Sequence, residues 1–337
     1  MALGPSNRTR ARPGDTGRVP GRPPSRGIPD APRRARRATA CDGTARALAS
    51  RAMTFSIVAR SEDGSELGVA VASKFLAVGA AVPAAEVGAG AIATQAMANL
   101  AYRPRGLALL AAGGDARDVL TTLLSEDAAH EHRQAGVVDA RGGAATFTGE
   151  ACFPWAGGTS GVTRPGSAYA IQGNILTGPE VVDTVEHAWR QADAARPFRH
   201  RLLDALLAGD RAGGDSRGRQ SAALFVVRPG GGYGGGSDVL VDLRVDDHPD
   251  PVPELVRLLA IRDLLFERPD PADCLPLEGD VADEVRRRLA ALGHNEFDLG
   301  TALENWAGIE NLEERMVPRR IDPLVLDHLR ALTGGTA

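Results

Sequence analysis

A threonine that begins an apolar segment is the first residue of the chain whose type and position could do chemistry. Thr54 directly follows Met53 and starts the alternating sequence Thr54–Arg60. If Met53 and everything before it were removed, Thr54 would carry a nucleophilic hydroxyl and a free α-amine of ordinary pKa about 7.7–8.0, its own general base. Such a residue could attack an amide or ester carbonyl. With the 53 preceding residues attached, its nitrogen is an amide and Thr54 is an ordinary strand residue.

Polar residues elsewhere in the chain could complete such a site. Asn174 follows Gly173 at the end of an expected strand, where its side-chain amide could stabilise an oxyanion. Asp215 lies in a glycine-rich loop and could pair with a nearby arginine to orient the α-amine or a substrate carboxylate. Contacts to substrate are expected from polar side chains beside the strands, namely Ser56, Thr94, Gln95, Asn99, Arg217 and Gln220. Ser56 is also the fallback nucleophile, although it has no attached amine. Turn formation, helix capping and a surface ion pair are the structural alternatives, and they stay open.

The remaining motifs do not indicate a metal or a cofactor. The alternate residues of His130-Glu131-His132 project apart, and Asp246-Asp247-His248 suits the capping of a following helix. The three cysteines are widely spaced and odd in number, which fits neither zinc binding nor a disulfide framework. The glycine-rich segment Gly230–Gly236 lacks the Lys-Ser/Thr of a phosphate loop. We therefore expect no metal and no cofactor.

The charge is distributed unevenly over the 337 residues. Residues 1–53 carry twelve arginines and three aspartates, about +9, so the net charge of −4 leaves about −13 on the rest of the chain. An acidic body argues against a nucleic-acid partner. Because no apolar run approaches the roughly 18 residues of a membrane span and no secretory h-region is visible, we expect a cytoplasmic protein without a membrane partner.

The elements that must position Thr54 lie in a predicted domain over residues 53–268. A hairpin begins it, and strands then alternate with pairs of helices. This order predicts an α+β fold, a four-layer αββα sandwich of two stacked sheets with helices outside. Residues 1–52 are rich in Arg and Pro and are expected to be disordered, either an over-long start before a true Met53 or a removable propeptide. Residues 277–337 predict a small all-α domain after a linker at Pro269–Pro276.

Several separated blocks resemble one known family. Met53-Thr-Phe-Ser-Ile-Val-Ala-Arg60 and Gly68-Val-Ala-Val-Ala-Ser-Lys74 form the first part of the resemblance. Gly213-Gly-Asp-Ser-Arg-Gly-Arg-Gln-Ser-Ala222 and Val241-Asp-Leu-Arg-Val-Asp-Asp-His-Pro249 form the second part. Together they are similar to DUF1028, a family regarded as N-terminal-nucleophile (Ntn) hydrolase-like. The resemblance implies the same αββα sandwich, with Thr54 as nucleophile once Met53 is removed.

The end of the chain resembles a second family. Trp306-Ala-Gly-Ile-Glu-Asn-Leu-Glu-Glu-Arg315 is similar to a peptidoglycan-binding module that often follows DUF1028. The two resemblances imply a hydrolase that cleaves an amide C–N bond of a small molecule or peptide, and a homodimer is expected. The alternative is a non-catalytic protein that binds a cell-wall fragment or glycan. Peptidoglycan lies outside the membrane, whereas the sequence shows no secretion signal. The sequence does not resolve this conflict.

Overall fold

The computed structural model describes residues 54–334, which belong to one compact unit, Ala49–Ala337. The predicted disorder of residues 1–52 and the state of Met53 lie outside the described residues. Thr54 is therefore the first residue whose surroundings can be described.

A six-stranded antiparallel sheet carries Thr54 near its centre. Its order is β10-β9-β2-β1-β8-β7. The strands are β10 Val239–Val245, β9 Ser221–Val227, β2 Leu67–Ser73, β1 Thr54–Arg60, β8 Ala168–Asn174 and β7 Gly157–Gly161. β1 pairs with β8 along its full length, so that Thr54 lies opposite Asn174. The predicted opening hairpin, β1 and β2, is present with the acidic, glycine-containing turn between its strands.

A second antiparallel sheet of four strands, in the order β3-β4-β5-β6, faces the first. Its strands are β3 Pro83–Glu86, β4 Gly90–Ala96, β5 Arg133–Asp139 and β6 Ala144–Thr148. One buried apolar cluster joins the two sheets, with Val58 and Val69 from the first and Ala91 and Val138 from the second. A core of small residues suits sheets that pack face to face at about 10 Å.

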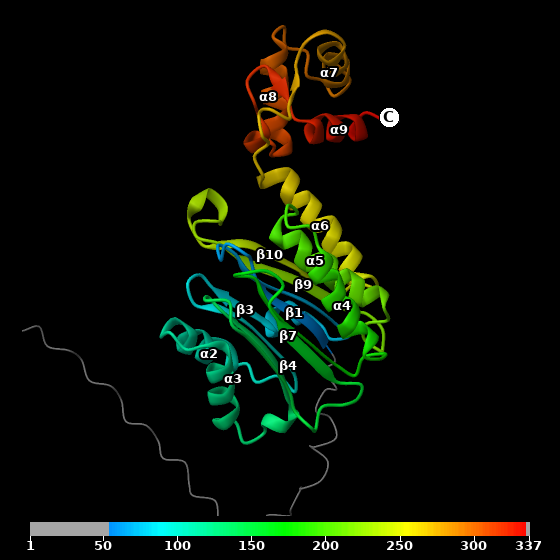
Figure 1. Ribbon diagram of the computed structural model, residues 1–337. Helices are drawn as coiled ribbons and strands as arrows, with labels where there is room; N and C mark the ends of the chain where they lie inside the picture. The colour runs from blue at the N-terminus through cyan, green and yellow to red at the C-terminus, as the bar shows by residue number, and fades with distance from the viewer. Residues whose placement is uncertain (1–53, 335–337) are drawn as a thin grey trace, which may run out of the picture. The chain divides into compact units, whose positions relative to one another are not determined.

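Helices cover the outer face of each sheet (Figure 1). The six-stranded sheet packs against α4 Glu180–Gln191, α5 Phe198–Arg211 and α6 Pro251–Phe266, and the four-stranded sheet against α2 Tyr102–Ala111 and α3 Ala116–Ser125. A short α1, Val78–Ala81, precedes β3. The predicted mixed character, with antiparallel sheets and a helical end, is confirmed. Assignment to the Ntn hydrolase class remains a prediction.

The alternation of β1 decides which side chains meet between the sheets. Phe55 and Ile57 point into the cluster under the helices, whereas Val58 lies in the cluster between the sheets. Because successive residues of a strand face opposite sides, Thr54 and Ser56 share the inter-sheet side with Val58. The candidate nucleophile thus faces the second sheet.

The C-terminal region forms its own apolar core. It contains α7 Gly279–Ala291, α8 Leu299–Glu310 and α9 Pro323–Leu332, with a two-stranded ladder of β11 Leu275–Pro276 and β12 Arg320–Ile321. Leu264 and Leu265, at the end of α6, pack against this core. Arg315 donates hydrogen bonds to the carbonyls of Leu264 and Asp263 at 2.7 and 2.5 Å. No helix within residues 54–334 is both long and apolar enough to cross a membrane.

Three local predictions differ from the structure. Gly209 predicts the end of a helix in the sequence, but α5 continues to Arg211, because this glycine serves close packing: a Cβ there would lie 2.4 Å from Val185 Cγ2. Pro104 predicts the start of a helix, but α2 begins at Tyr102. The sequence predicts a loop over residues 152–158; residues 152–156 are a loop, but Gly157 and Gly158 begin β7, a glycine-rich strand formed by pairing with β8.

Candidate functional site

Thr54 is held at the start of the central strand β1 and is nearly buried, with 2% of its surface exposed. Its hydroxyl oxygen lies 3.2 Å from the hydroxyl oxygen of Ser73, the last residue of β2. The same threonine lines a pocket of about 360 Å³. The residue that carries this hydroxyl thus lines a cavity of ligand size at the point where the strand begins.

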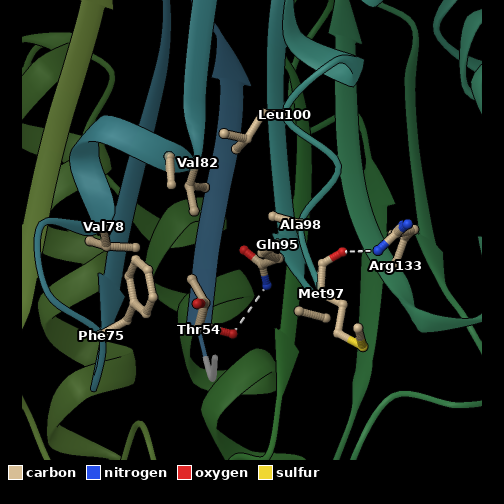
Figure 2. Close-up of a pocket in the computed structure, with 11 residues that line it drawn as sticks. Thr54, Phe75, Val78, Val82, Gln95, Met97, Ala98, Leu100 and Arg133 are labelled. Atoms are coloured by element: carbon tan, nitrogen blue, oxygen red, sulfur yellow. Dashed lines mark hydrogen bonds between the residues drawn. The ribbon is translucent and has the colours of Figure 1, made fainter. Parts of the chain in front are cut away.

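The pocket beside Thr54 is mainly apolar. Figure 2 shows the side chains around it, which come from the segment after β2, from α1 and from the end of β4. Besides Thr54, its lining residues are Phe75, Val78, Ala81, Val82, Gln95, Ala96, Met97, Ala98, Leu100 and Arg133. Such a lining suits an uncharged group with substantial apolar surface.

Arg133, the one charged residue that lines this pocket, is already paired. Its Nε donates to Asp127 at 2.8 Å, and Nη1 donates to the carbonyl of Met97. The hydrogen bond from Arg133 holds the pKa of Asp127 well below its usual range, and contacts from Asn99 and Tyr102 act in the same direction. The carboxylate therefore stays ionised near neutral pH, and it balances the guanidinium.

A network of buried amide side chains lies between the sheets next to Thr54. Gln95 Nε2 donates to Gln134 Oε1 at 2.7 Å, and Asn174 Nδ2 donates to the same oxygen at 2.9 Å. Ser56 donates to Gln95 Oε1 at 2.7 Å and accepts from Gln172 Nε2 at 2.6 Å. All five side chains are at most 1% exposed. Because each buried polar atom of the network needs a partner, the arrangement specifies one packing of the two sheets.

This amide network holds the main chain of Thr54. Its carbonyl oxygen accepts from Gln95 Nε2 at 3.1 Å and from Asn174 Nδ2 at 3.4 Å. Gln95 is on β4 and Asn174 on β8, so the two sheets jointly fix the first residue of β1. The short bond of Asn174 goes to Gln134, and its bond to Thr54 is the longer and weaker one.

The backbone is strained around the same point. Ala96 has φ 63° and directly follows Gln95, while Ile175 has φ 50° and directly follows Asn174. The left-handed region costs a residue with a Cβ roughly 1–2 kcal/mol. Residues held this way gather at functional sites, where the surrounding structure imposes them. Here both follow an amide of the network.

Asp215 contacts the main chain directly after β2. It is 7% exposed and accepts from the backbone N–H of Lys74 at 2.7 Å and of Arg217 at 2.9 Å. Arg217 Nη2 in turn donates to the carbonyl of Lys74 at 3.1 Å. Lys74 follows Ser73, whose hydroxyl meets that of Thr54. The loop thus supports the residue that contacts the candidate nucleophile.

The other predicted substrate contacts are less closely associated with Thr54. Thr94 donates to the carbonyl of Asn99 at 3.3 Å, and the Asn99 side chain donates to Asp127 at 2.9 Å, so both brace the segment after β4. The Gln220 side chain donates to Asp247 at 3.1 Å, while its main-chain N–H donates to the Ser73 carbonyl at 3.1 Å. The structure therefore brings together Thr54, Ser56, Gln95 and Asn174, with Asp215 and Arg217 behind Ser73.

Sequence reasoning missed Ser73, Gln134 and Gln172. Gln172 occupies the same strand face as Ala170 and Asn174, a polar residue within a buried strand, and that pattern could have singled it out. Gln134 stands at the start of β5, where a lone glutamine gives no comparable signal. Among residues 54–334 there is no group of three or more His, Cys, Asp or Glu side chains placed to hold a metal ion.

Comparisons with known proteins cover both parts of the chain. Residues 54–255 match the family model described as "Family of unknown function (DUF1028)", and residues 265–329 match the one described as "Putative peptidoglycan binding domain". A crystal structure of a DUF1028 protein from Silicibacter pomeroyi is similar, with 29% sequence identity and a TM-score of 0.54. That similarity covers 68% of this chain and 92% of the other. The comparison with curated proteins gave no match.

Proposed function

Because this chain belongs to the DUF1028 family of unknown function, we propose its activity from the site itself: an Ntn hydrolase that cleaves an amide C–N bond in a small molecule or peptide. The observation that carries the proposal is the position of Thr54. Thr54 lines a ligand-sized pocket and is the first residue of the central strand β1. Two facing antiparallel sheets between helices support the assignment to the Ntn class.

In the proposed reaction, Thr54 acts with its nitrogen freed as an α-amine. The amine accepts the hydroxyl proton while Oγ1 attacks the substrate carbonyl. The C–N bond breaks as the amine returns the proton to the leaving nitrogen, and an ester remains on Oγ1. Water then hydrolyses this ester, which restores the hydroxyl and releases the acid.

Two groups have supporting roles in the proposal. The second hydrogen of Asn174 Nδ2 now makes the weak 3.4 Å contact with the carbonyl of Thr54. In the proposed reaction this hydrogen and backbone N–H groups would donate to the developing oxyanion. Asp215 is a positioning residue, because it reaches the Thr54 hydroxyl only through the main chain of Lys74 and the hydroxyl of Ser73. No described side chain other than Ser73 hydrogen-bonds Thr54 Oγ1, so the proposal assigns the base to the nitrogen of Thr54.

Protein produced from Met53 tests the proposal. Intact mass and N-terminal sequencing should show that Met53 is removed, and a screen of small amides should find an activity. Thr54→Ala should abolish it and Thr54→Ser should keep a part, whereas Ser56→Ala should leave the nucleophile in place. Retention of Met53 with undiminished activity, or full activity in Thr54→Ala, would contradict the mechanism.

A second candidate function rests on the C-terminal match. We propose that the region of residues 265–329 binds a peptidoglycan fragment or related glycan. Phe297 and Ile309 are 99% and 67% exposed in this region, so they can be changed without opening the core. Sedimentation of the full chain with peptidoglycan should weaken in Phe297→Ser or Ile309→Ser, while Val162→Ser, at an exposed residue outside the matched region, is the control. Equal sedimentation of all variants would contradict the proposal.

The cellular location and the assembly state also belong to the proposal. Cys152 and Cys274 are free thiols, which supports the cytoplasm as a reducing compartment. There the glycan ligand would be a recycled wall fragment. A homodimer is proposed as well, and light scattering of the full chain tests it.

A further inference from the structure

We propose that the group bound beside Thr54 is a neutral, apolar acyl chain of a few carbons, which makes the substrate an amide of a short aliphatic or aromatic acid. This inference rests on the proposed hydrolase function and names the substrate class of its site. Three observations support it: the apolar lining of the pocket, the pairing of its polar side chains within the protein, and the position of Thr54, whose Oγ1 would carry the acyl group.

The walls of the pocket favour apolar surface. Phe75, Val78 and Val82 come from the segment between β2 and β3, and Met97 and Leu100 follow β4. Figure 2 shows these side chains gathered around Thr54. Met97 and Leu100 are 41% and 49% exposed. Exposure of apolar surface to water is unfavourable, and a bound apolar group would reduce it.

The two long polar side chains that line the pocket, Gln95 and Arg133, already have partners within the protein. Gln95 Nε2 donates to the carbonyls of Thr54 and Gln172 and to Gln134 Oε1, and its Oε1 accepts from Ser56. Arg133 is paired with an ionised carboxylate. A carboxylate or ammonium placed here would lose its hydration and would have to compete with these existing partners, which is unfavourable.

The position of Thr54 Oγ1 decides which half of the substrate enters the pocket. In the acyl-enzyme this oxygen carries the acyl group, and Thr54 itself lines the cavity. The polar neighbours on the other side, Ser73, Lys74 and Asp215, do not line it. The acyl chain therefore takes the apolar pocket and the leaving amine the polar side. A volume of about 360 Å³ is at the small end for ligand sites, so the chain is short.

A series of p-nitroanilides tests the inference in the protein that begins with free Thr54. The value of kcat/KM should rise about fourfold for each methylene from acetyl through butyryl to hexanoyl, as expected for burial of CH₂ groups. Glutaryl p-nitroanilide, similar in length to the hexanoyl compound but charged, should be slower by on the order of tenfold or more. A glutaryl rate equal to the hexanoyl rate would overturn the inference.

Binding to the full chain separates this inference from the proposed hydrolysis. In Thr54→Ala, calorimetry should detect hexanamide and should give at least about tenfold weaker binding of glutaramic acid. Ala98→Phe, which places a ring in the pocket, should abolish hexanamide binding, and Ala111→Phe, on the exposed end of α2, should not. If no anilide is hydrolysed but this preference holds, the proposed function fails and the ligand class stands. Equal binding of both probes, or binding unaffected by Ala98→Phe, overturns the inference.

Discussion

Replacement of Gln134 by leucine tests whether the amide network holds the two sheets in register. Gln134 is fully buried, and its Oε1 is the shared acceptor for Gln95 and Asn174. Its Nε2 donates to Thr148 Oγ1 at 2.8 Å and to the carbonyl of Gly173 at 2.8 Å. Leucine has a similar volume, so the change removes hydrogen bonds without opening a large cavity.

The expected loss of stability follows from the partners left behind. Asn174 would keep only the 3.4 Å contact to Thr54, and a buried donor without a partner costs about 1–3 kcal/mol. Gln95 would keep two carbonyl acceptors and lose one bond of about 1 kcal/mol. Loss of the Thr148 bond adds about 1 kcal/mol more. We therefore expect Gln134→Leu to lower the free energy of unfolding by about 3–5 kcal/mol, a large part of a typical total of 5–15 kcal/mol.

Urea unfolding followed by tryptophan fluorescence measures this loss. A Trp306→Phe background removes the tryptophan of the C-terminal core, so that the signal comes from the first domain. With a slope of about 2–3 kcal/mol per molar urea, the midpoint should fall by more than about 1 M. Gln220→Leu is the matched control, because Gln220 is only partly buried and its side chain makes one bond, to Asp247. A Gln134→Leu loss no larger than that of this control would refute the reasoning.

Three further changes test other features of the fold. Hydrogen bonding to Arg201 lowers the pKa of Glu62 from its ordinary value of 4.5 to about 2. The contribution of Glu62 to stability is therefore present above pH 4.5 and is lost as the pH falls to 2. Glu62→Gln should flatten that part of an acid-unfolding curve, and an unchanged curve would contradict this. Ala96→Gly should raise the melting temperature by relieving the left-handed backbone, worth about 1 kcal/mol, whereas Ala93→Gly in extended backbone of the same strand should lower it; the reverse order would count against strain at the site. Arg315→Met should destabilise the C-terminal core by about 3–5 kcal/mol, because the buried carboxylate of Asp322 is left without its ion-pair partner. The fluorescence of Trp306, which lies in that core, measures the loss. Unchanged stability would mean that the ion pair is dispensable.

Local patterns in the sequence were enough to place most elements. β1 and β2 have the predicted alternation around a turn at Gly64, whose φ of 74° suits glycine. An aspartate directly before an apolar helical pattern predicts a helix cap, and Asp115 does cap α3, accepting from the N–H of Asp118 at 2.9 Å. Both signals are carried by neighbouring residues. The periodicity of apolar residues predicts a helix or a strand, and a single side chain predicts a cap.

The features that the sequence did not reveal depend on partners far away in the chain. β7 has no apolar alternation and is a strand because its main chain pairs with β8. Gln134 and Gln95 meet because β4 and β5 are neighbours, and Asn174 joins them from the other sheet. The pocket likewise combines segments before β3 and after β4. Thr54, Gln95 and Asn174 could be proposed from residue type, but the glutamine that links them required the register.

The proposed hydrolase and a protein that only binds its ligand beside Thr54 differ by one covalent bond. As long as a residue precedes Thr54, its nitrogen is an amide, and the pocket can only bind. The contacts that fix Thr54 do not depend on that bond: its carbonyl is held by Gln95 and Asn174, its hydroxyl meets Ser73, and its strand pairs on both sides. Removal of the preceding residues would therefore free the base while the nucleophile and the pocket stay in place. In the proposed mechanism, a binding site and a hydrolytic site are therefore two covalent states of the same residues.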